Sequence, residues 1–432
     1  MNDLHDIAAR ARNAYYLISD SSADARNHAL TLLADLLKKN KEQIYEANRE
    51  DLEAAKAEKL ADPLLHRLAF NEDKLLQVTG GLTALAAMQD PLNHTVCSTE
   101  ITEGLKLYRV TSPIGVIGVI FESRPDALIQ ISSLCIKSGN AVLLKGGREA
   151  LRTNKVLCGL VRDALEGASL PADAAQLLET REDVARMLKE DTLIDLIIPR
   201  GSNSFVRYIM DNSRIPVLGH ADGICHVYID QFADPDMAVR VAVDSKTQNV
   251  SVCNAMETLL VHQEIAPRIL PVLAQKLRSF NVAIRGDEQT AGLIECDPAV
   301  EADWSEEYLD YILSVRIVPS LQAAVSHINH YGSHHTDAIV TSDAKRASAF
   351  MRQVDSAGVY WNVSTRFADG FVYGLGAEVG ISTGKLHARG PMGLEGLTTY
   401  KYKLIGCGQT MDEMKKGIRA YTHQSLNEVC PL

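Results

Sequence analysis

The chain has 432 residues, 46% of them hydrophobic, and its 44 Lys and Arg against 55 Asp and Glu give a formal net charge of −11. Proteins that hold duplex phosphates are usually basic, so this balance argues against nucleic acid as the main partner. The longest apolar run, residues 114–121, is far shorter than the roughly 18 residues of a membrane-spanning helix. The N-terminus is acidic where a secretory signal would be basic. We therefore expect a soluble, cytoplasmic protein of two or three domains that binds no membrane.

The first part of the chain has the pattern of amphipathic helices. A helix start is predicted at residues 21–24, and further helical stretches at residues 44–59 and 75–88. The pattern then changes, because residues 105–110 alternate with period two and predict a half-exposed strand. The first helix should bury one face, formed by Leu30, Leu33, Leu36 and Leu37.

From residue 114 onwards, short apolar runs alternate with helical patterns. This rhythm is typical of an α/β fold with open, mostly parallel sheets that are covered on both faces. The first series of predicted strands is 114–121, 141–144, 176–178, 193–198 and 215–218, with helices at 149–165, 181–189 and 205–211. A second series begins near His226 and includes 255–262, 315–318 and 337–340, and the chain ends with an alternating stretch at 397–405.

Two loops follow predicted strands at the edge where ligands bind in such sheets. Lys145, Gly146, Gly147 and Arg148 combine glycines that admit a ligand with fixed positive charge at a helix start, which favours an anion. An ordinary turn with solvated basic side chains is the alternative. The loop at residues 199–204 has the same design.

Familiar motifs elsewhere are incomplete. Residues 374–380 are one residue too long for a dinucleotide fingerprint, and residues 380–386 lack both the spacing and the hydroxyl of a phosphate loop. We expect no metal site, because no carboxylate-rich context accompanies the histidines, which are His327, His330, His334 and His335.

The cysteines are widely spaced, with no C-x-x-C pair, which argues against a structural zinc or a redox dithiol. Cys253 differs from the others because it follows a polar loop and precedes a strand, a position that can leave a thiol at the edge of a cleft. On composition alone, a buried inert thiol is the more common outcome. The eight positions are 97, 135, 158, 225, 253, 296, 407 and 430.

Four segments together resemble the γ-glutamyl phosphate reductases, a branch of the aldehyde dehydrogenase superfamily. They are residues 113–126, 138–147, 252–262 and 376–391, and the similarity covers nearly the whole chain. The resemblance implies an NADP-binding domain (1–99 and 111–225), a catalytic domain (226–395) and a β-flap (100–110 and 396–432) that joins subunits of a homo-oligomer.

The resemblance also implies a reaction. NADPH reduces L-glutamyl 5-phosphate to glutamate 5-semialdehyde, with release of phosphate, in proline biosynthesis, and the glutamate 5-kinase that makes this substrate is a possible partner. Cys253 takes the place of the nucleophile, and Lys145 matches the lysine that contacts the adenosine ribose. Gly201-Ser202 resembles the pair near the cofactor pyrophosphate, and Glu307 falls where a glutamate holds the nicotinamide ribose.

Departures from the superfamily pattern refine this expectation. The glutamate that activates water in ordinary aldehyde dehydrogenases is replaced by glycine within residues 217–223, which favours reduction of an acyl phosphate. The oxyanion asparagine is also missing, because residues 122–124 read Glu-Ser-Arg. Arg148 stands where NAD-using relatives carry a glutamate, which favours NADPH. Candidates for the substrate's carboxylate and phosphate are Arg124, Arg366 and Arg389, each of which could instead be a structural salt-bridge residue.

Two rival hypotheses remain at this stage. The chain could be a related thioester-forming reductase that acts on another acyl phosphate. It could also be a cofactor-binding or structural oligomer that has lost catalysis, although the Cys253 segment is intact.

Overall fold

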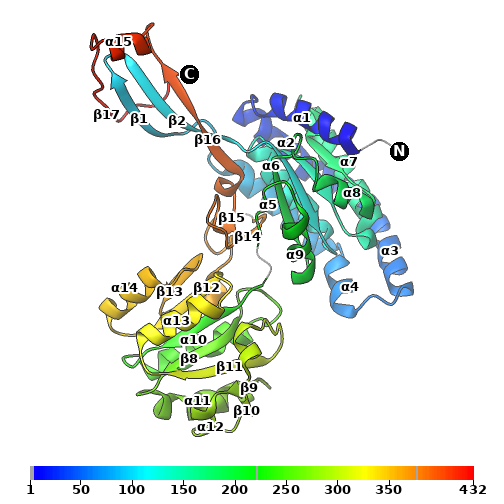
Figure 1. Ribbon diagram of the computed structural model, residues 1–432. Coiled ribbons are helices and arrows are strands. Elements are labelled where there is room, and N and C mark those ends of the chain that lie inside the picture. Colours follow the sequence, from blue (N-terminus) through cyan, green and yellow to red (C-terminus); the bar gives the residue numbers. More distant parts are fainter. Residues whose placement is uncertain (1–3, 220–221, 376–377) are drawn as a thin grey trace.

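The computed structural model describes residues 4–219, 222–375 and 378–432, in two lobes and a projecting sheet (Figure 1). His220 and Ala221 of the segment 217–223, and Gly376 and Ala377 of the segment 376–391, lie outside the described residues. Over the described part of the chain, no helix is both long and apolar enough to cross a membrane.

The N-terminal helices follow the leucine pattern of the sequence. Ser22 caps the second helix by accepting a hydrogen bond from the Ala25 N–H at 3.2 Å, so the predicted start is confirmed. Leu30, Leu33 and Leu37 are fully buried. A helix before residue 20 was not predicted, because its buried face is mostly alanine. The helices are α1 (Leu4–Ile18), α2 (Ala23–Lys39), α3 (Lys41–Ala57), α4 (Asp62–Leu68) and α5 (Glu72–Ala87).

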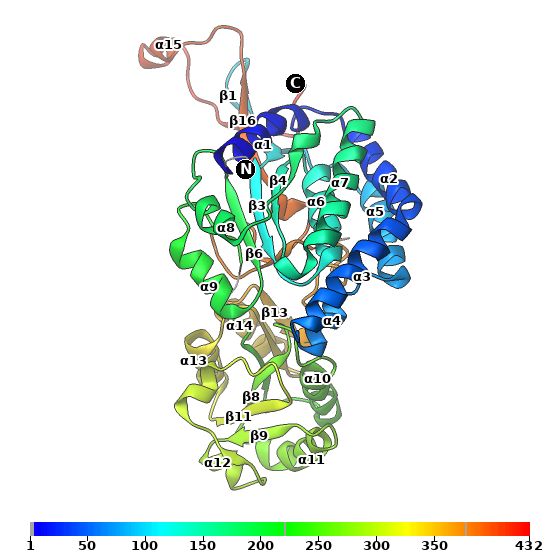
Figure 2. The ribbon, with the colours of Figure 1, turned by 90° about the vertical axis from the view of Figure 1, so that its right-hand side faces the viewer.

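The first lobe is built on a parallel sheet in the order β5-β4-β3-β6. Figure 2 shows helices on both sides of this sheet, as the α/β pattern predicts. The strands are β3 (Val116–Phe121), β4 (Ala141–Lys145), β5 (Ala175–Leu177) and β6 (Leu196–Arg200). The helices are α6 (Pro125–Lys137), α7 (Leu151–Gly167), α8 (Arg181–Met187) and α9 (Asn203–Asn212).

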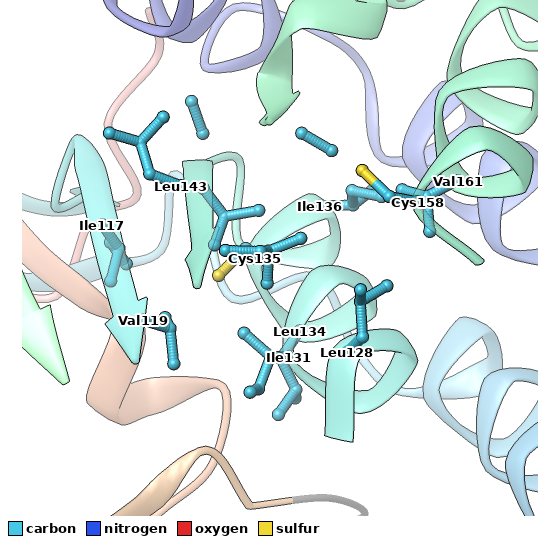
Figure 3. Packing of buried hydrophobic residues seen from close by; sticks show 14 of the residues in the cluster. Ile117, Val119, Leu128, Ile131, Leu134, Cys135, Ile136, Leu143, Cys158 and Val161 are labelled. Carbon is cyan, nitrogen blue, oxygen red and sulfur yellow. The ribbon is translucent and has the colours of Figure 1, made fainter. Parts of the chain in front are cut away.

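The core of this lobe lies between the sheet and the helices α6 and α7. Figure 3 shows Leu134 and Cys135 of α6 in one cluster with Val119 of β3, Leu143 of β4 and Cys158 of α7. Burial raises the pKa of the Cys135 thiol to about 12 and that of Cys158 to about 11, so neither thiol is a ready nucleophile.

One predicted strand of this lobe is wrong. Residues 215–218 make only an isolated parallel bridge, between Ile197 and Val217. Pro216 has no N–H to donate to a ladder, which is the physical reason that the segment does not extend as a strand.

The second lobe contains a seven-stranded parallel sheet in the order β10-β9-β11-β8-β7-β12-β13. Both faces of the sheet are buried: Val227 and Leu259 pack into one cluster, and Tyr228 and Leu260 into another. The strands are β7 (Cys225–Ile229), β8 (Met256–His262), β9 (Ala283–Gly286), β10 (Asp297–Pro298), β11 (Ile312–Val318), β12 (Thr336–Val340) and β13 (Gly358–Trp361). The helices are α10 (Pro235–Thr247), α11 (Ala266–Arg278), α12 (Glu288–Ala291), α13 (Leu321–Tyr331) and α14 (Ala344–Gln353).

The chain returns to the first lobe earlier than the sequence predicted. The short hairpin of β14 (Gly380–Ser382) and β15 (Gly390–Met392) lies beside that lobe, and Val379, Met392 and Leu394 belong to its core. The range 226–395, predicted as a catalytic domain, therefore includes a stretch that packs with the first lobe. Short 3₁₀ turns lie at Arg148–Ala150, Ala172–Ala174, Glu301–Ser305, Thr365–Phe367 and Glu395–Leu397.

A four-stranded antiparallel sheet projects from the two lobes (Figure 1). Its β16 pairs with β2 from Thr398 opposite Pro113 to Ile405 opposite Lys106, so the two alternating stretches that the sequence predicts as strands, 105–110 and 397–405, are neighbours in one sheet. The sheet includes more residues than the predicted flap (100–110 and 396–432), because β1 begins at Thr95 and β2 ends at Pro113. The strands are β1 (Thr95–Thr102), β2 (Leu105–Pro113), β16 (Thr398–Ile405) and β17 (Gln424–Leu426), and the helix α15 (Met411–Lys415) joins the last two.

The role of this sheet in joining subunits stays a prediction. β16 forms one edge of the sheet, and the side chains of Tyr402 and Leu404 on it are each 59% exposed. We expect deletion of the residues after Gly396 to give monomers or aggregates, because it removes that edge and its apolar side chains. Light scattering of the truncated and full chains measures this, and an intact oligomer in the truncated protein would contradict the assignment.

Candidate active site

Cys253 lies where two cavities meet. It belongs to the segment between α10 and β8 and shares a cavity with Arg124 and Arg200 of the first lobe. Its side chain is half-buried, whereas Cys135, Cys158 and Cys225 are buried. One cavity of about 690 Å³, here called cavity 1, and another of about 570 Å³, called cavity 2, both have Cys253 in their walls. A thiol in this position can meet ligands from two sides.

The backbone around Cys253 is packed so closely that its position is fixed. A Cβ on Gly223 would lie 2.2 Å from the Cys253 carbonyl oxygen and 2.5 Å from the Cys253 Cβ, so only glycine fits beside the turn that carries Cys253. The Cys225 thiol donates a hydrogen bond to the same carbonyl at 3.3 Å. Burial raises the pKa of Cys225, which leaves it a structural thiol.

Three arginines line cavity 1 around Cys253. Arg124 lies at the start of α6, Arg200 ends β6, and Arg366 belongs to the 3₁₀ turn at Thr365–Phe367. The helices α5 and α6 form another wall of this cavity. Guanidinium groups from three elements therefore converge on one space, which suits a ligand that carries more than one negative charge.

The three guanidinium groups are only partly neutralised by the protein. Arg124 donates to Asp126 Oδ2 at 2.8 Å. Burial lowers the pKa of Arg200 and Arg124 lowers it further, while Glu378 opposes this shift from 3.9 Å. Burial also lowers the pKa of Arg366, whose Nε donates to the neutral amide oxygen of Gln248 at 2.9 Å. An anionic ligand would be stabilised at this place.

The sequence assigned no role to Arg200. The sequence feature that could have identified it is its position at the end of a buried strand, directly before Gly201-Ser202. Ligands bind at the carboxyl edge of a parallel sheet, which is where this strand end lies. Glu378 was also missed, although its carboxylate lines both cavities and accepts a hydrogen bond from the Gly370 N–H at 2.8 Å.

Arg389 does not join the other arginines. Its guanidinium bonds to Asp355, with Nη2 3.1 Å from Oδ1, and it is absent from the walls of cavities 1 and 2. In the described structure, Arg389 is thus placed as a salt-bridge residue, the alternative that the sequence left open.

Cavity 2 brings together Gly201, Ser202 and Glu307 with Cys253. Ser202 begins α9, and its backbone N–H donates to the Glu122 carboxylate at 3.3 Å. A Cβ at Gly201 would lie 2.9 Å from that carboxylate. The N–H at the start of α9 is therefore bonded to a carboxylate of the chain itself, and an anionic cofactor group would have to displace Glu122 to bind at this helix N-terminus. Glu307 accepts a hydrogen bond from the Asn203 side chain, which ties it to this loop.

The Lys145 loop lies away from Cys253 and is more tightly packed than expected. Lys145 is buried and donates to the Gly146 carbonyl at 2.5 Å, and burial lowers its pKa. A Cβ at Gly146 would meet the Asn154 side chain at 2.2 Å. A Cβ at Gly147 would likewise meet the Glu149 carboxylate, at 2.0 Å. The room left by the two glycines is thus filled by the chain's own side chains. Arg148 is exposed and donates to Glu58 at 2.7 Å.

Of the histidines that the sequence singled out, His327 and His335 are buried in the second lobe, His334 is half-buried and His330 is exposed. His327 is buried against Arg316, whose Nη1 lies 3.0 Å from His327 Nδ1. Burial lowers the pKa of His327 to about 2. Among the residues that the structure describes, no group of three or more His, Cys, Asp or Glu side chains is placed to hold a metal ion.

Comparisons with known proteins identify the family. The aldehyde dehydrogenase family matches residues 1–295. The chain is 56% identical to a γ-glutamyl phosphate reductase of Acetivibrio thermocellus, over 99% of this chain and 100% of the relative, and 52% identical to γ-glutamyl phosphate reductase 1 of Synechocystis, over 99% of each.

Solved structures agree with the sequence relatives. The crystal structure of γ-glutamyl phosphate reductase from Thermotoga maritima superposes with a TM-score of 0.93 at 37% identity, covering 95% of this chain and 100% of that one. An acetylating aldehyde dehydrogenase from Geobacillus thermoglucosidasius shares the fold, with a TM-score of 0.64 at 16% identity over 94% of this chain and 97% of that one. The chain therefore belongs to the aldehyde dehydrogenase family and, within it, to the γ-glutamyl phosphate reductases.

Proposed function

We propose that this protein uses NADPH to reduce L-glutamyl 5-phosphate to L-glutamate 5-semialdehyde and phosphate, through a thioester on Cys253, in the route from glutamate to proline. Membership of the family makes the chain an oxidoreductase that acts on a small molecule with a nicotinamide cofactor. The observation that carries the finer proposal is the position of Cys253 between two cavities of different chemistry.

Cavity 1 suits the acyl phosphate. Its arginines can bind the phosphate and carboxylate of a glutamyl phosphate, because a guanidinium donates paired hydrogen bonds to such groups. Cavity 2 suits the cofactor, with the N-terminus of α9 toward its phosphates and Glu307 toward a ribose. When bound, the nicotinamide supplies the hydride.

The reaction divides into an acylation and a reduction at the same carbon. The Cys253 thiolate attacks the acyl carbon, the bond to the phosphate oxygen breaks, and phosphate leaves with its electron pair. The resulting thioester is reduced at that carbon, and the C–S bond then breaks to release the aldehyde and restore the thiolate. Both additions create an oxyanion, and the Cys253 N–H is our candidate donor to it, a contribution of about 3 kcal/mol for one such donor.

Phosphate dependence tests this proposal. The purified protein should reduce NADP⁺ with glutamate 5-semialdehyde only when phosphate is present, because phosphate, and not water, resolves the thioester. The assay follows absorbance at the nicotinamide band with and without phosphate. Equal rates in both conditions would indicate a hydrolytic aldehyde dehydrogenase, and a requirement for another acyl acceptor such as a thiol would indicate a different reductase.

Arg200 should contribute strongly to substrate binding. Substitution Arg200→Met removes a guanidinium beside Cys253, so kcat/KM for the acyl phosphate should fall about ten- to a hundredfold, with most of the effect in KM. Steady-state kinetics measures it. Arg389→Met is the matched comparison, because Arg389 is held by Asp355 outside cavity 1 and should matter much less. Equal losses in the two variants would contradict the assignment of Arg200.

Three further expectations belong to this proposal. NADPH specificity is assigned to Arg148. A homo-oligomer is expected to form through the projecting sheet. A cytoplasmic location and a functional association with a glutamate 5-kinase fit an enzyme whose acyl phosphate substrate hydrolyses readily.

A further inference from the structure

A buried ion pair closes the base of the turn that carries Cys253. Lys246 lies in the last turn of α10, before Cys253, and Glu257 lies on β8, after it. The Lys246 Nζ is 2.6 Å from Glu257 Oε2, and both side chains are fully buried. Burying two charges is costly, and apolar residues of similar volume often stabilise a fold equally well. A contribution to stability is therefore a weak explanation for an ion pair at this position.

The second oxygen of Glu257 reaches the cofactor side of the site. Glu257 Oε1 accepts a hydrogen bond from the Leu309 N–H at 3.2 Å. Leu309 has a φ of +51°, a left-handed conformation that is uncommon for a leucine and needs support from its surroundings. Leu309 and Glu307 belong to one segment, and both line cavity 2 together with Cys253. One carboxylate thus bonds to both the nucleophile turn and the segment that carries Glu307.

The same connection continues into the cofactor loop. Glu307 accepts a hydrogen bond from the side chain of Asn203, the residue after Ser202 at the start of α9. Polar contacts and the short stretch of backbone between Leu309 and Glu307 therefore connect Lys246 and Glu257, on either side of Cys253, to Asn203 at the start of α9. Burial raises the pKa of Glu257 to about 7 and lowers that of Lys246, which is consistent with a site shielded from water.

We propose that Lys246 and Glu257 are positioning residues that hold the Glu307 segment in register with Cys253, so that a cofactor in cavity 2 lies correctly for reduction at the thioester. This inference rests on the proposed function only in placing the nicotinamide cofactor in cavity 2. Neither side chain touches the substrate, so their effect is transmitted through the backbone of the two segments.

Two double variants separate positioning from charge. Lys246→Met with Glu257→Gln keeps an oxygen acceptor for the Leu309 N–H, whereas Lys246→Met with Glu257→Met removes it, and neither leaves an unpaired buried charge. The Met/Met variant should raise the Kd for NADPH, measured by nucleotide fluorescence in the absence of substrate, by about tenfold or more relative to the Met/Gln variant. The alkylation rate of Cys253 by iodoacetamide should differ little between the two.

A buried ion pair elsewhere in the same lobe provides the control. Arg346 bonds to the buried Asp230 at 2.5 Å and lines neither cavity 1 nor cavity 2. Arg346→Met should lower the melting temperature without changing the Kd for NADPH. If the Met/Met variant behaves in the same way, the Lys246–Glu257 pair is merely structural and the proposal is overturned.

A conservative variant keeps the test decisive if the Met/Met protein does not fold. Glu257→Asp retains the charge opposite Lys246 but withdraws the carboxylate by one methylene, so it cannot keep both contacts, and it should raise the Kd for NADPH at least about fivefold. An unchanged Kd in this variant would also overturn the proposal. These binding measurements need no turnover, so a wild-type protein that binds NADPH but fails to reduce the acyl phosphate would refute the proposed function and not this inference.

Discussion

Cys253→Ser should abolish phosphate-dependent turnover, with a loss of kcat of at least about 10³-fold, the range that a missing proton acceptor commonly costs a hydroxyl nucleophile. A thiol is partly ionised near neutral pH, but a serine hydroxyl is not and would need a base. Folding and NADPH binding should be retained, because the substitution changes one atom of a half-buried side chain. Steady-state kinetics, thermal melting and nucleotide fluorescence measure the three quantities.

Cys296→Ser is the control for this experiment. Cys296 is also half-buried but lines none of the described cavities, so its variant should keep full activity in the folded fraction. The same is expected of the remaining cysteines. Turnover that survives in Cys253→Ser would rule out the covalent mechanism, whatever the relatives do.

Most central strands of the two parallel sheets could be predicted in chain order, because the sequence of a parallel strand that is buried on both faces is a nearly continuous run of apolar residues. β3 reads as such a run and is completely buried, whereas β8 is equally buried although it contains Glu257 and Thr258. Cys253 could be singled out as the candidate nucleophile because its segment resembles a known family, and its position in the walls of cavities 1 and 2 is consistent with that role, which stays a prediction. Residues 215–218 read the same way but fail as a strand, because a single proline removes a ladder donor.

The convergence of Arg124, Arg200 and Arg366 could not be read from the chain. These residues lie on three elements far apart in sequence, and only the packing of the two lobes brings them to one cavity. The partners of a given charge were equally hidden: Arg389 and Arg366 look alike in the sequence, yet one is bound by Asp355 and the other faces Cys253. The sequence does not show which carboxylate, if any, will pair with a given arginine in the folded chain.

The glycines correctly indicated places where another group lies close to the backbone, but the sequence did not show which group that is. Gly146 and Gly147 were expected to leave room for a ligand, but the space beside them is taken by Asn154 and Glu149. Gly223 belongs to the segment 217–223, which the sequence marked only for the loss of a glutamate, and yet its missing side chain lets the Cys253 turn pack where it does. A glycine indicates a close approach, while the identity of the approaching group depends on the fold.

Arg148→Glu should move the cofactor preference strongly toward NADH. A guanidinium can donate paired hydrogen bonds to the 2′-phosphate of NADPH, whereas a carboxylate repels that phosphate and accepts hydrogen bonds from the ribose hydroxyls of NADH. The ratio of kcat/KM for NADPH to that for NADH should therefore fall by about ten- to a hundredfold. Kinetics with both cofactors, at one fixed salt concentration, measures this ratio.

The contact between Arg148 and Glu58 makes the prediction sharper. Because Glu58 holds the guanidinium at 2.7 Å, a 2′-phosphate must compete with it, and Glu58→Gln should lower the KM for NADPH while leaving that for NADH unchanged. Lys155→Glu makes the same charge change on the helix α7 that follows Arg148, at a lysine paired with Glu179, and should leave the ratio unaltered. If the ratio of kcat/KM for NADPH to that for NADH is the same in Arg148→Glu as in Lys155→Glu, Arg148 remains bound to Glu58 and does not contact the phosphate. NADPH selectivity would then have to come from the buried Lys145, whose ammonium group is held beside the same loop.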